Sequence, residues 1–175
     1  CASPEIAMGI AYAWRGQGYF QSLDMKQSAP ELLALIDLLT ADKVSRILEI
    51  GSHKGGTLFV WSQLVKKFQN AQLISIDLPG GEFGGGHRSG HEILFESFCR
   101  EGQQLKIIRG DSHDSKIVKL CSQSLQHPVD FLFIDGDHSY EGVKLDYENF
   151  KQFVKPGGLI GFHDIVRRHD KPEIE

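Results

Sequence analysis

Carboxylates and histidines stand at several places along the chain, each at or just after the end of a short apolar run. They are Asp77, Asp111, Asp135 with His138, and His163 with Asp164. Carboxylates can bind ribose hydroxyls or a hard cation such as Mg²⁺. A histidine, whose ordinary pKa lies near neutrality, can take a proton from a hydroxyl group, and a cation on that hydroxyl would lower its pKa. The pattern therefore indicates chemistry at a hydroxyl group.

A glycine turn follows the first apolar run, in the segment RILEIGSHKGGT at residues 46–57. The apolar run predicts a buried strand, and the helical spacing of the apolar residues beyond the turn predicts a helix. Glycines let the backbone approach a ligand closely, and the first amides of a helix point at it. This segment is typical of the nucleotide-binding start of an open α/β sheet, although a plain strand-to-helix turn would look the same.

The spacing of the glycines narrows the class of ligand. A dinucleotide-binding turn reads G-x-G-x-x-G, and a P-loop requires Gly-Lys-Ser/Thr after four intervening residues. His53 occupies the second glycine position of the first pattern, and the second pattern is absent from this segment. What remains is E-x-G-x-x-x-G, formed by Glu49, Gly51 and Gly55.

Segments of strand length alternate with helical patterns after residue 46. The expected strands cover 47–50, 71–77, 105–109, 128–135 and 159–162, and they end at Gly51, Asp77, Asp111, Asp135 and Asp164. Alternation with crossover helices predicts a doubly wound, mainly parallel, Rossmann-like α/β sheet. Because the carboxyl ends of parallel strands meet at one edge, these polar residues are expected to form a single site.

Each strand-end residue has a functional and a plainer interpretation. Asp77, at the end of the second strand, is placed to bind a ribose, or it is simply a polar strand end. Asp111 could accept a hydrogen bond from an adenine amino group, with Ser112 as a nearby donor. Alternatively, Asp111, Ser112 or Asp114 could simply cap the next helix. Asp135 could bind a cation or cap the helix that follows it.

The metal and the base are assigned to the last two strand ends. The expected metal ligands are Asp135, Asp164 and His163, and the expected catalytic residues are His138 and Asp135. A histidine is an unusual ligand for Mg²⁺ and suits a softer ion better.

Two connecting segments also carry predictions. A glycine-rich loop at 78–92 is long enough to act as a lid over the site. A helix at 92–100 is expected to bury Ile93, Leu94, Phe95 and Phe98. Residues 1–40 are expected to form an arm and a helix that cap a core at 41–175, all in one domain.

The bulk properties exclude several classes of protein. The 175 residues carry 19 basic and 23 acidic side chains, a net charge of −4, which does not favour nucleic acid. No apolar run is long enough to cross a bilayer, and the first residues do not form a secretion signal. Three scattered cysteines without a CxxC pair suit a reducing compartment, so we expect a cytoplasmic protein without a membrane partner.

Taken in order, these segments resemble the class I methyltransferases that depend on S-adenosylmethionine (SAM), within the cephalosporin hydroxylase-like and macrolide sugar O-methyltransferase group. The matching segments are the E-x-G-x-x-x-G turn, Asp77, Gly110-Asp111-Ser112, FIDGDHSYEGV at 133–143, PGG at 156–158 and His163-Asp164. The resemblance covers residues 27–166, and the segment at 133–143 is its most specific part.

The resemblance implies a role for each matching residue. SAM contacts are implied at Glu49, Gly51, Ser52, Gly55, Asp77, Asp111, Ser112 and Asp135. Relatives that methylate sugars use an aspartate and a histidine three residues later as metal ligand and base, which match Asp135 and His138. Their second ligand pair is acidic at both positions, so only Asp164 of His163-Asp164 transfers directly. The family also has a C-terminal strand hairpin, which we expect to be lacking or truncated here, leaving an edge that favours a homo-oligomer.

Together with the polar strand ends, the resemblance implies a SAM-dependent O-methyltransferase that acts on a hydroxylated small molecule, with a sugar or a glycosylated metabolite as the expected acceptor. Mg²⁺ or another divalent cation would assist it. Two alternatives stay open: an NAD-linked oxidoreductase on the same fold, and a SAM-binding domain without catalytic activity.

Overall fold

Five parallel strands form one sheet in the computed structural model, which describes residues 3–16, 22, 23, 25–80 and 90–165. The strands are β1 (Arg46–Ile50), β2 (Ala71–Asp77), β3 (Gln103–Arg109), β4 (Val129–Ile134) and β5 (Val154–Phe162). Their order across the sheet is β3-β2-β1-β4-β5, and each neighbouring pair is parallel. The predicted doubly wound, parallel α/β sheet is confirmed.

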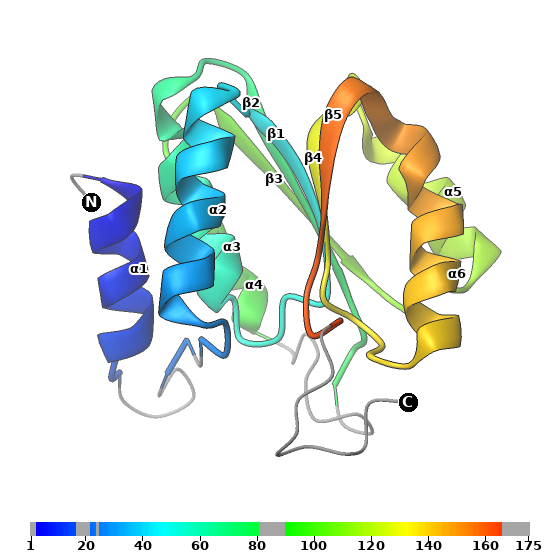
Figure 1. Ribbon diagram of the computed structural model, residues 1–175, viewed down its shortest axis with the longest axis horizontal. Helices are drawn as coiled ribbons and strands as arrows, with labels where there is room; N and C mark the ends of the chain where they lie inside the picture. The colour runs from blue at the N-terminus through cyan, green and yellow to red at the C-terminus, as the bar shows by residue number, and fades with distance from the viewer. Residues whose placement is uncertain (1–2, 17–21, 24, 81–89, 166–175) are drawn as a thin grey trace.

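Helices cover both faces of this sheet (Figure 1). One face carries α1 (Pro4–Ala13), α2 (Ala29–Ala41), α3 (Gly56–Leu64) and α4 (His91–Glu96), and the other carries α5 (Ser115–Ser124) and α6 (Tyr140–Phe150). Short 3₁₀ turns, Val65–Lys67 and Lys151–Phe153, follow α3 and α6. Among the described helices, none combines the length and the apolar character that crossing a membrane requires.

Strand β4, which lies between β1 and β5, shows why the sequence folds this way. Successive side chains of a strand point to opposite faces, and all six residues of β4 are buried. Phe131 and Phe133 belong to the core beneath α1–α4, and Leu132 and Ile134 to the core beneath α5 and α6. Trp61 of α3 packs edge-on against both phenylalanines, with ring centroids 5.9 and 5.6 Å away. Because helices cover both faces of the sheet, every residue of β4 must be apolar or otherwise tolerate burial, which explains its nearly unbroken apolar run.

Two details differ from the sequence-based expectation. The expected helix at 92–100 ends at Glu96, and Ile93 is 72% exposed, because Phe95 and Phe98 already form the one stripe that faces the core. Strand β5 begins at Val154, earlier than expected. Its Pro-Gly-Gly segment lies in a register shift opposite Val129 and Phe131, where a bulge admits residues that would break a regular strand.

A fully buried carboxylate, Glu49 of β1, ties the glycine turn to the strands around it. Its Oε2 accepts a hydrogen bond from the Ser52 hydroxyl (2.7 Å), and its Oε1 accepts one from the indole Nε1 of Trp61 (2.9 Å). The Ser52 hydroxyl also lies 2.6 Å from that of Ser75 on β2. One side chain thus fixes β1, the turn and α3 relative to each other.

Burial raises the pKa of Glu49 to about 7, against the opposing effect of hydrogen bonds from Thr57, Ser52 and Trp61. The native protein therefore holds a proton on Glu49 at a pH where the unfolded chain has lost it. The protonated Glu49 side chain therefore contributes fully to the stability of the native protein below its ordinary pKa of 4.5. This contribution is lost as the pH rises through the pKa that Glu49 has in the native protein.

The variant Glu49→Gln should remove this pH dependence, because its amide does not titrate. Between pH 4.5 and pH 8 its free energy of unfolding should rise by about 3 kcal/mol relative to that of the wild type. Urea unfolding at several pH values measures this difference. Glu148→Gln, an exposed change on α6, is the matched control and should show no such trend; parallel curves for Glu49→Gln and the wild type would refute the assignment.

Candidate functional site

Backbone hydrogen bonds continue past the ends of the strands and join them at one edge of the sheet. The residues that follow β1, β3, β4 and β5 donate to a carbonyl of the neighbouring strand, in the pairs Gly51–Ile76, Gly110–Asp77, Asp135–Ile50 and His163–Ile134, over 2.8–3.0 Å. This edge lies at the bottom of Figure 1. The polar residues predicted from the strand ends therefore do share one edge.

Asp135, directly after β4, is the centre of the densest polar cluster at this edge. Its Oδ2 accepts a hydrogen bond of 2.6 Å from Nε2 of Gln27. Its Oδ1 faces two imidazoles, with Nδ1 of His163 at 2.8 Å and Nε2 of His138 at 3.2 Å. The Asp164 carboxylate closes the cluster, 3.6 Å from Nδ1 of His163 and 3.7 Å from Nδ1 of His138. Four predicted site residues are thus brought together.

The charges in this cluster stabilise one another. Burial alone would raise the pKa of Asp135, but His138 and His163 lower it below its ordinary value. The Asp135 carboxylate in turn raises the pKa of both histidines, against the opposing effect of burial. The arrangement favours an ionised carboxylate beside imidazoles that accept a proton readily.

The same side chains form a plausible set of donors for a cation. Asp135, His138 and His163 each offer one ligand atom, and these atoms lie within 4.8 Å of one another. Nδ1 of His163 is buried and makes no hydrogen bond of normal geometry, despite its short distance to Asp135. An oxygen with imidazole nitrogens suits Mn²⁺, Fe²⁺ or Zn²⁺ better than Mg²⁺.

Asp77 connects the end of β2 to the glycine turn. Its Oδ2 accepts a hydrogen bond from the backbone amide of His53 (2.6 Å), and its Oδ1 accepts one from that of Leu78 (2.7 Å). Burial raises the pKa of Asp77, although these amides favour the charged form. His53, at the place of the missing glycine, adopts a φ of 47°, which directs the turn towards Asp77.

The glycines of the turn permit close packing of the backbone. Gly51 and Gly55 have φ values of 84° and 85°, which side chains rarely allow. A Cβ on Gly51 would lie 1.9 Å from the carbonyl oxygen of Asp135, and one on Gly55 would lie 2.4 Å from the ring of Phe95. Any side chain at these positions would push the turn away from the loop after β4 and from α4.

Helix capping does not account for the strand-end acids. Asp114, not Asp111, caps α5, and Ser139, not Asp135, caps α6. Asp111 is exposed and accepts a hydrogen bond from the backbone amide of His113 (2.9 Å). Asp111 and Ser112 lie at the end of β3 and are not part of the Asp135 cluster.

Gln27 is a site residue that the sequence did not reveal. Its carbonyl oxygen accepts a hydrogen bond from the Tyr12 hydroxyl of α1, so the arm before α2 is anchored next to Asp135. Leu23 and Met25 of the same arm lie against Gly56 at the start of α3. A contact between residues 108 positions apart leaves no local pattern to read. The predicted lid falls largely on residues 81–89, outside the described part of the chain.

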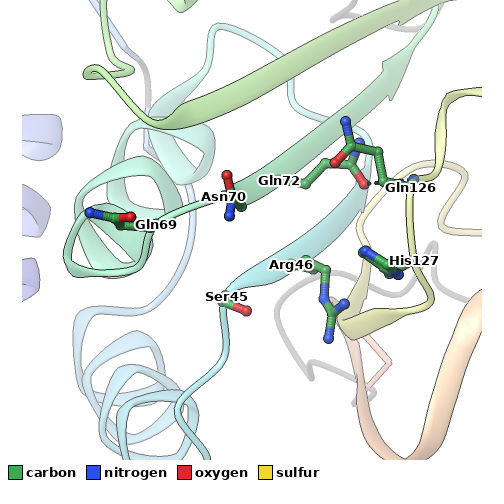
Figure 2. A pocket seen from close by; sticks show the side chains of 7 residues that line it. All are labelled: Ser45, Arg46, Gln69, Asn70, Gln72, Gln126 and His127. Carbon is green, nitrogen blue, oxygen red and sulfur yellow. Dashed lines mark hydrogen bonds between the residues drawn. The ribbon is translucent and has the colours of Figure 1, made fainter.

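A hollow of about 390 Å³ lies at the opposite edge of the sheet, where the strands begin (Figure 2). It is lined by Ser45, Arg46, Gln69, Asn70, Gln72, Gln126 and His127. The charge of Arg46 is already compensated by Asp130, which lies 3.2 Å from its guanidinium and 2.8 Å from the Lys155 ammonium. None of the predicted site residues lines this hollow.

The fold is similar to those of several solved methyltransferases. MycE from the mycinamycin biosynthetic pathway, solved with Mg, S-adenosylhomocysteine (SAH) and mycinamycin VI, has a TM-score of 0.57 at 19% identity, over 93% of this chain and 39% of MycE. CalS11, a TDP-rhamnose 3'-O-methyltransferase of calicheamicin biosynthesis, has a TM-score of 0.59 at 14% identity, over 98% of this chain and 79% of CalS11. An O-methyltransferase from Bacillus cereus has a TM-score of 0.58 at 17% identity, over 90% of this chain and 63% of its own. At these identities the likeness establishes the fold.

Relatives in sequence are uncharacterized proteins. R132 of Acanthamoeba polyphaga mimivirus is 32% identical over 133 residues, which is 73% of this chain and 54% of R132. The protein y4gI of Sinorhizobium fredii is 30% identical over 138 residues, 75% of this chain and 14% of y4gI. The chain therefore spans about half of the first relative and a small part of the second. A family model described as a methyltransferase domain matches residues 48–165, and the chain belongs to this methyltransferase domain family.

Proposed function

We propose that this chain binds SAM and transfers its methyl group to a hydroxyl group of a small molecule. The observation that carries the proposal is the Asp135, His138 and His163 cluster, which lies at the same sheet edge as the glycine turn and Asp77. Membership of the methyltransferase domain family supports SAM as the methyl donor. A basic imidazole beside a carboxylate supports oxygen as the methyl acceptor.

We assign the SAM contacts to the first four strand ends. Asp77 accepts hydrogen bonds from the ribose hydroxyls, and Asp111 and Ser112 contact the adenine. Gly51, Gly55 and Ser52 bring the backbone of the turn close to the ligand. Glu49, for which the resemblance implied a SAM contact, is fully buried and supports the turn through Ser52 and Trp61 instead. Asp135 places a negative charge near the sulfur. SAM supplies a methyl group on a positively charged sulfur.

His138 serves as the general base in this proposal. Its side chain is 44% exposed, so an acceptor can reach it, while Asp135 and Asp164 flank its two ring nitrogens. The acceptor O–H bond breaks as its oxygen bonds to the methyl carbon and the S–CH₃ bond breaks, and the proton passes to His138. The two carboxylates stabilise the imidazolium that results. Much of the rate comes from holding the reacting atoms in line.

Of the donors in this cluster, Asp135 and His163 would hold a divalent cation, together with Asp164, which lies 3.6 Å from Nδ1 of His163. His138, although near enough to bind the cation, would be left to accept the proton. Such a cation would lower the pKa of the acceptor hydroxyl and orient it. The orphaned Nδ1 of His163 fits this role, because it points into the cluster without a normal hydrogen bond. Because His163 would supply a nitrogen ligand, Mn²⁺ is a better probe of this site than Mg²⁺.

A sugar or glycosylated metabolite is the acceptor that we propose. The support is indirect: CalS11 is named as a TDP-rhamnose methyltransferase, and MycE was solved with mycinamycin VI. We propose the cytoplasm as its location, because Cys99 and Cys121 are free thiols. Burial raises the pKa of Cys99 to about 11 and that of Cys121 to about 12, which keeps both protonated and unreactive.

Calorimetry with SAH tests the SAM site. The wild type should bind, and Asp77→Ala should bind roughly ten- to a hundredfold more weakly, because a charged acceptor of hydrogen bonds is lost. Asp37→Ala, on an exposed part of α2, is the control and should bind as the wild type does. Absence of SAH binding at millimolar concentration, with NADH binding in its place, would contradict the proposal and favour an oxidoreductase.

Substitution of each histidine should distinguish the proposed base, His138, from the proposed metal ligand, His163. His138→Ala should retain affinity for SAH and Mn²⁺ but lose about 10²–10⁴-fold in methyl transfer from labelled SAM to a panel of free and nucleotide-linked sugars. His163→Ala should weaken Mn²⁺ binding, followed by electron paramagnetic resonance, and retain SAH binding. Full turnover of His138→Ala would remove the base assignment, and unchanged Mn²⁺ affinity of His163→Ala would remove the metal assignment.

A further inference from the structure

A buried carboxylate, Asp146 of α6, lies beneath the loop that follows β3. Its side chain is 0% exposed, and neither oxygen makes a hydrogen bond of normal geometry to any described residue. Nε2 of His113, on that loop, lies 3.4 Å from Oδ1 and is likewise buried without a normal hydrogen bond. Burying two incompletely bonded polar groups against each other is costly, so this pair calls for an explanation beyond packing.

Asp146 sits where two loops of the site edge meet. A Cβ on Gly136, in the loop after β4, would lie 3.2 Å from Oδ2 of Asp146, so this loop also rests on the carboxylate. One turn further along α6, Nδ2 of Asn149 donates to the carbonyl oxygen of Ser112 over 3.4 Å. Two side chains of one helix thus hold the loop that carries Asp111 and Ser112.

The charges around Asp146 make its contact with His113 sensitive to pH. Burial raises the pKa of Asp146 to about 6, and the nearby carboxylates of Asp137 and Asp111 add to this effect. The Ser112 side chain and the charge of His113 oppose it. Because its pKa is raised, the Asp146 carboxylate takes up a proton at a higher pH than an ordinary aspartate does.

We propose that Asp146 and His113 form a latch that positions the loop at 110–114 for the nucleoside end of SAM. Asp146 is a positioning residue, because it touches no ligand and acts through His113 and Ser112. The inference rests on the proposed function, in which Asp111 and Ser112 contact the adenine. When Asp146 is protonated, its oxygens are weaker partners for Nε2 of His113, the loop is held less firmly, and affinity for the nucleoside falls.

Calorimetric titration of SAH into wild type and Asp146→Asn between pH 5 and pH 8 tests the latch. At pH 7.5 the variant should bind SAH about tenfold more weakly, because an amide oxygen is a weaker acceptor for Nε2 of His113 than a carboxylate oxygen. The difference should shrink towards pH 5, where the carboxylate of the wild type is itself protonated. Glu148→Gln, an exposed change two residues further along α6, should follow the wild type at every pH.

A second variant keeps the test decisive if Asp146→Asn folds poorly. His113→Gln, on the loop itself, should weaken SAH binding by the same factor, and the double variant should be no weaker than either single one. Thermal unfolding without ligand checks that each variant is folded. The latch would be overturned if the folded variants bound SAH as the wild type does. It would also be overturned if the losses of SAH affinity in the two single variants added up in the double variant. Absence of SAH binding by the wild type would instead overturn the proposed function.

Discussion

The parallel pairing of the five strands is the constraint on which the candidate site depends. Because every strand runs in the same direction, the residues that follow them meet at one edge, and backbone hydrogen bonds between neighbouring strand ends fix their spacing. Asp135 follows β4, which lies between β1 and β5, so it stands between the glycine turn after β1 and His163 after β5. A change of register in any one strand would separate these groups.

Three carboxylates of this region differ in environment, and the differences suggest different roles. Asp135 faces two histidines, which lower its pKa and keep it charged at the centre of the cluster. Glu49 and Asp146 are fully buried, and burial raises the pKa of each. Glu49 supports the glycine turn through Ser52 and Trp61, whereas Asp146 lies beneath the loop after β3. Asp135 is thus partly exposed at the sheet edge, whereas Glu49 and Asp146 are fully buried beneath it.

The sequence predicted the strands and the polar edge because both follow from local patterns. Buried parallel strands must be apolar, and residues after them must be polar to face a ligand, so β2 and the position of Asp135 could be read directly. Contacts made across the fold left no such pattern. Gln27 reaches Asp135 from the arm, and Asp146 meets His113 only once α6 packs beside the loop after β3. The exposure of Ile93 also depended on which stripe of a short helix faced the core.

A crystal structure of this chain with bound SAH would test the central claim most directly. We predict that the adenosine lies along the edge between Asp77 and Asp111, with the sulfur beside Asp135 and His138. The ribose hydroxyls should bond to the Asp77 carboxylate. SAH bound instead in the amide-lined hollow at the opposite edge (Figure 2), or bound at the strand ends without contact to Asp77 and Asp135, would contradict the account.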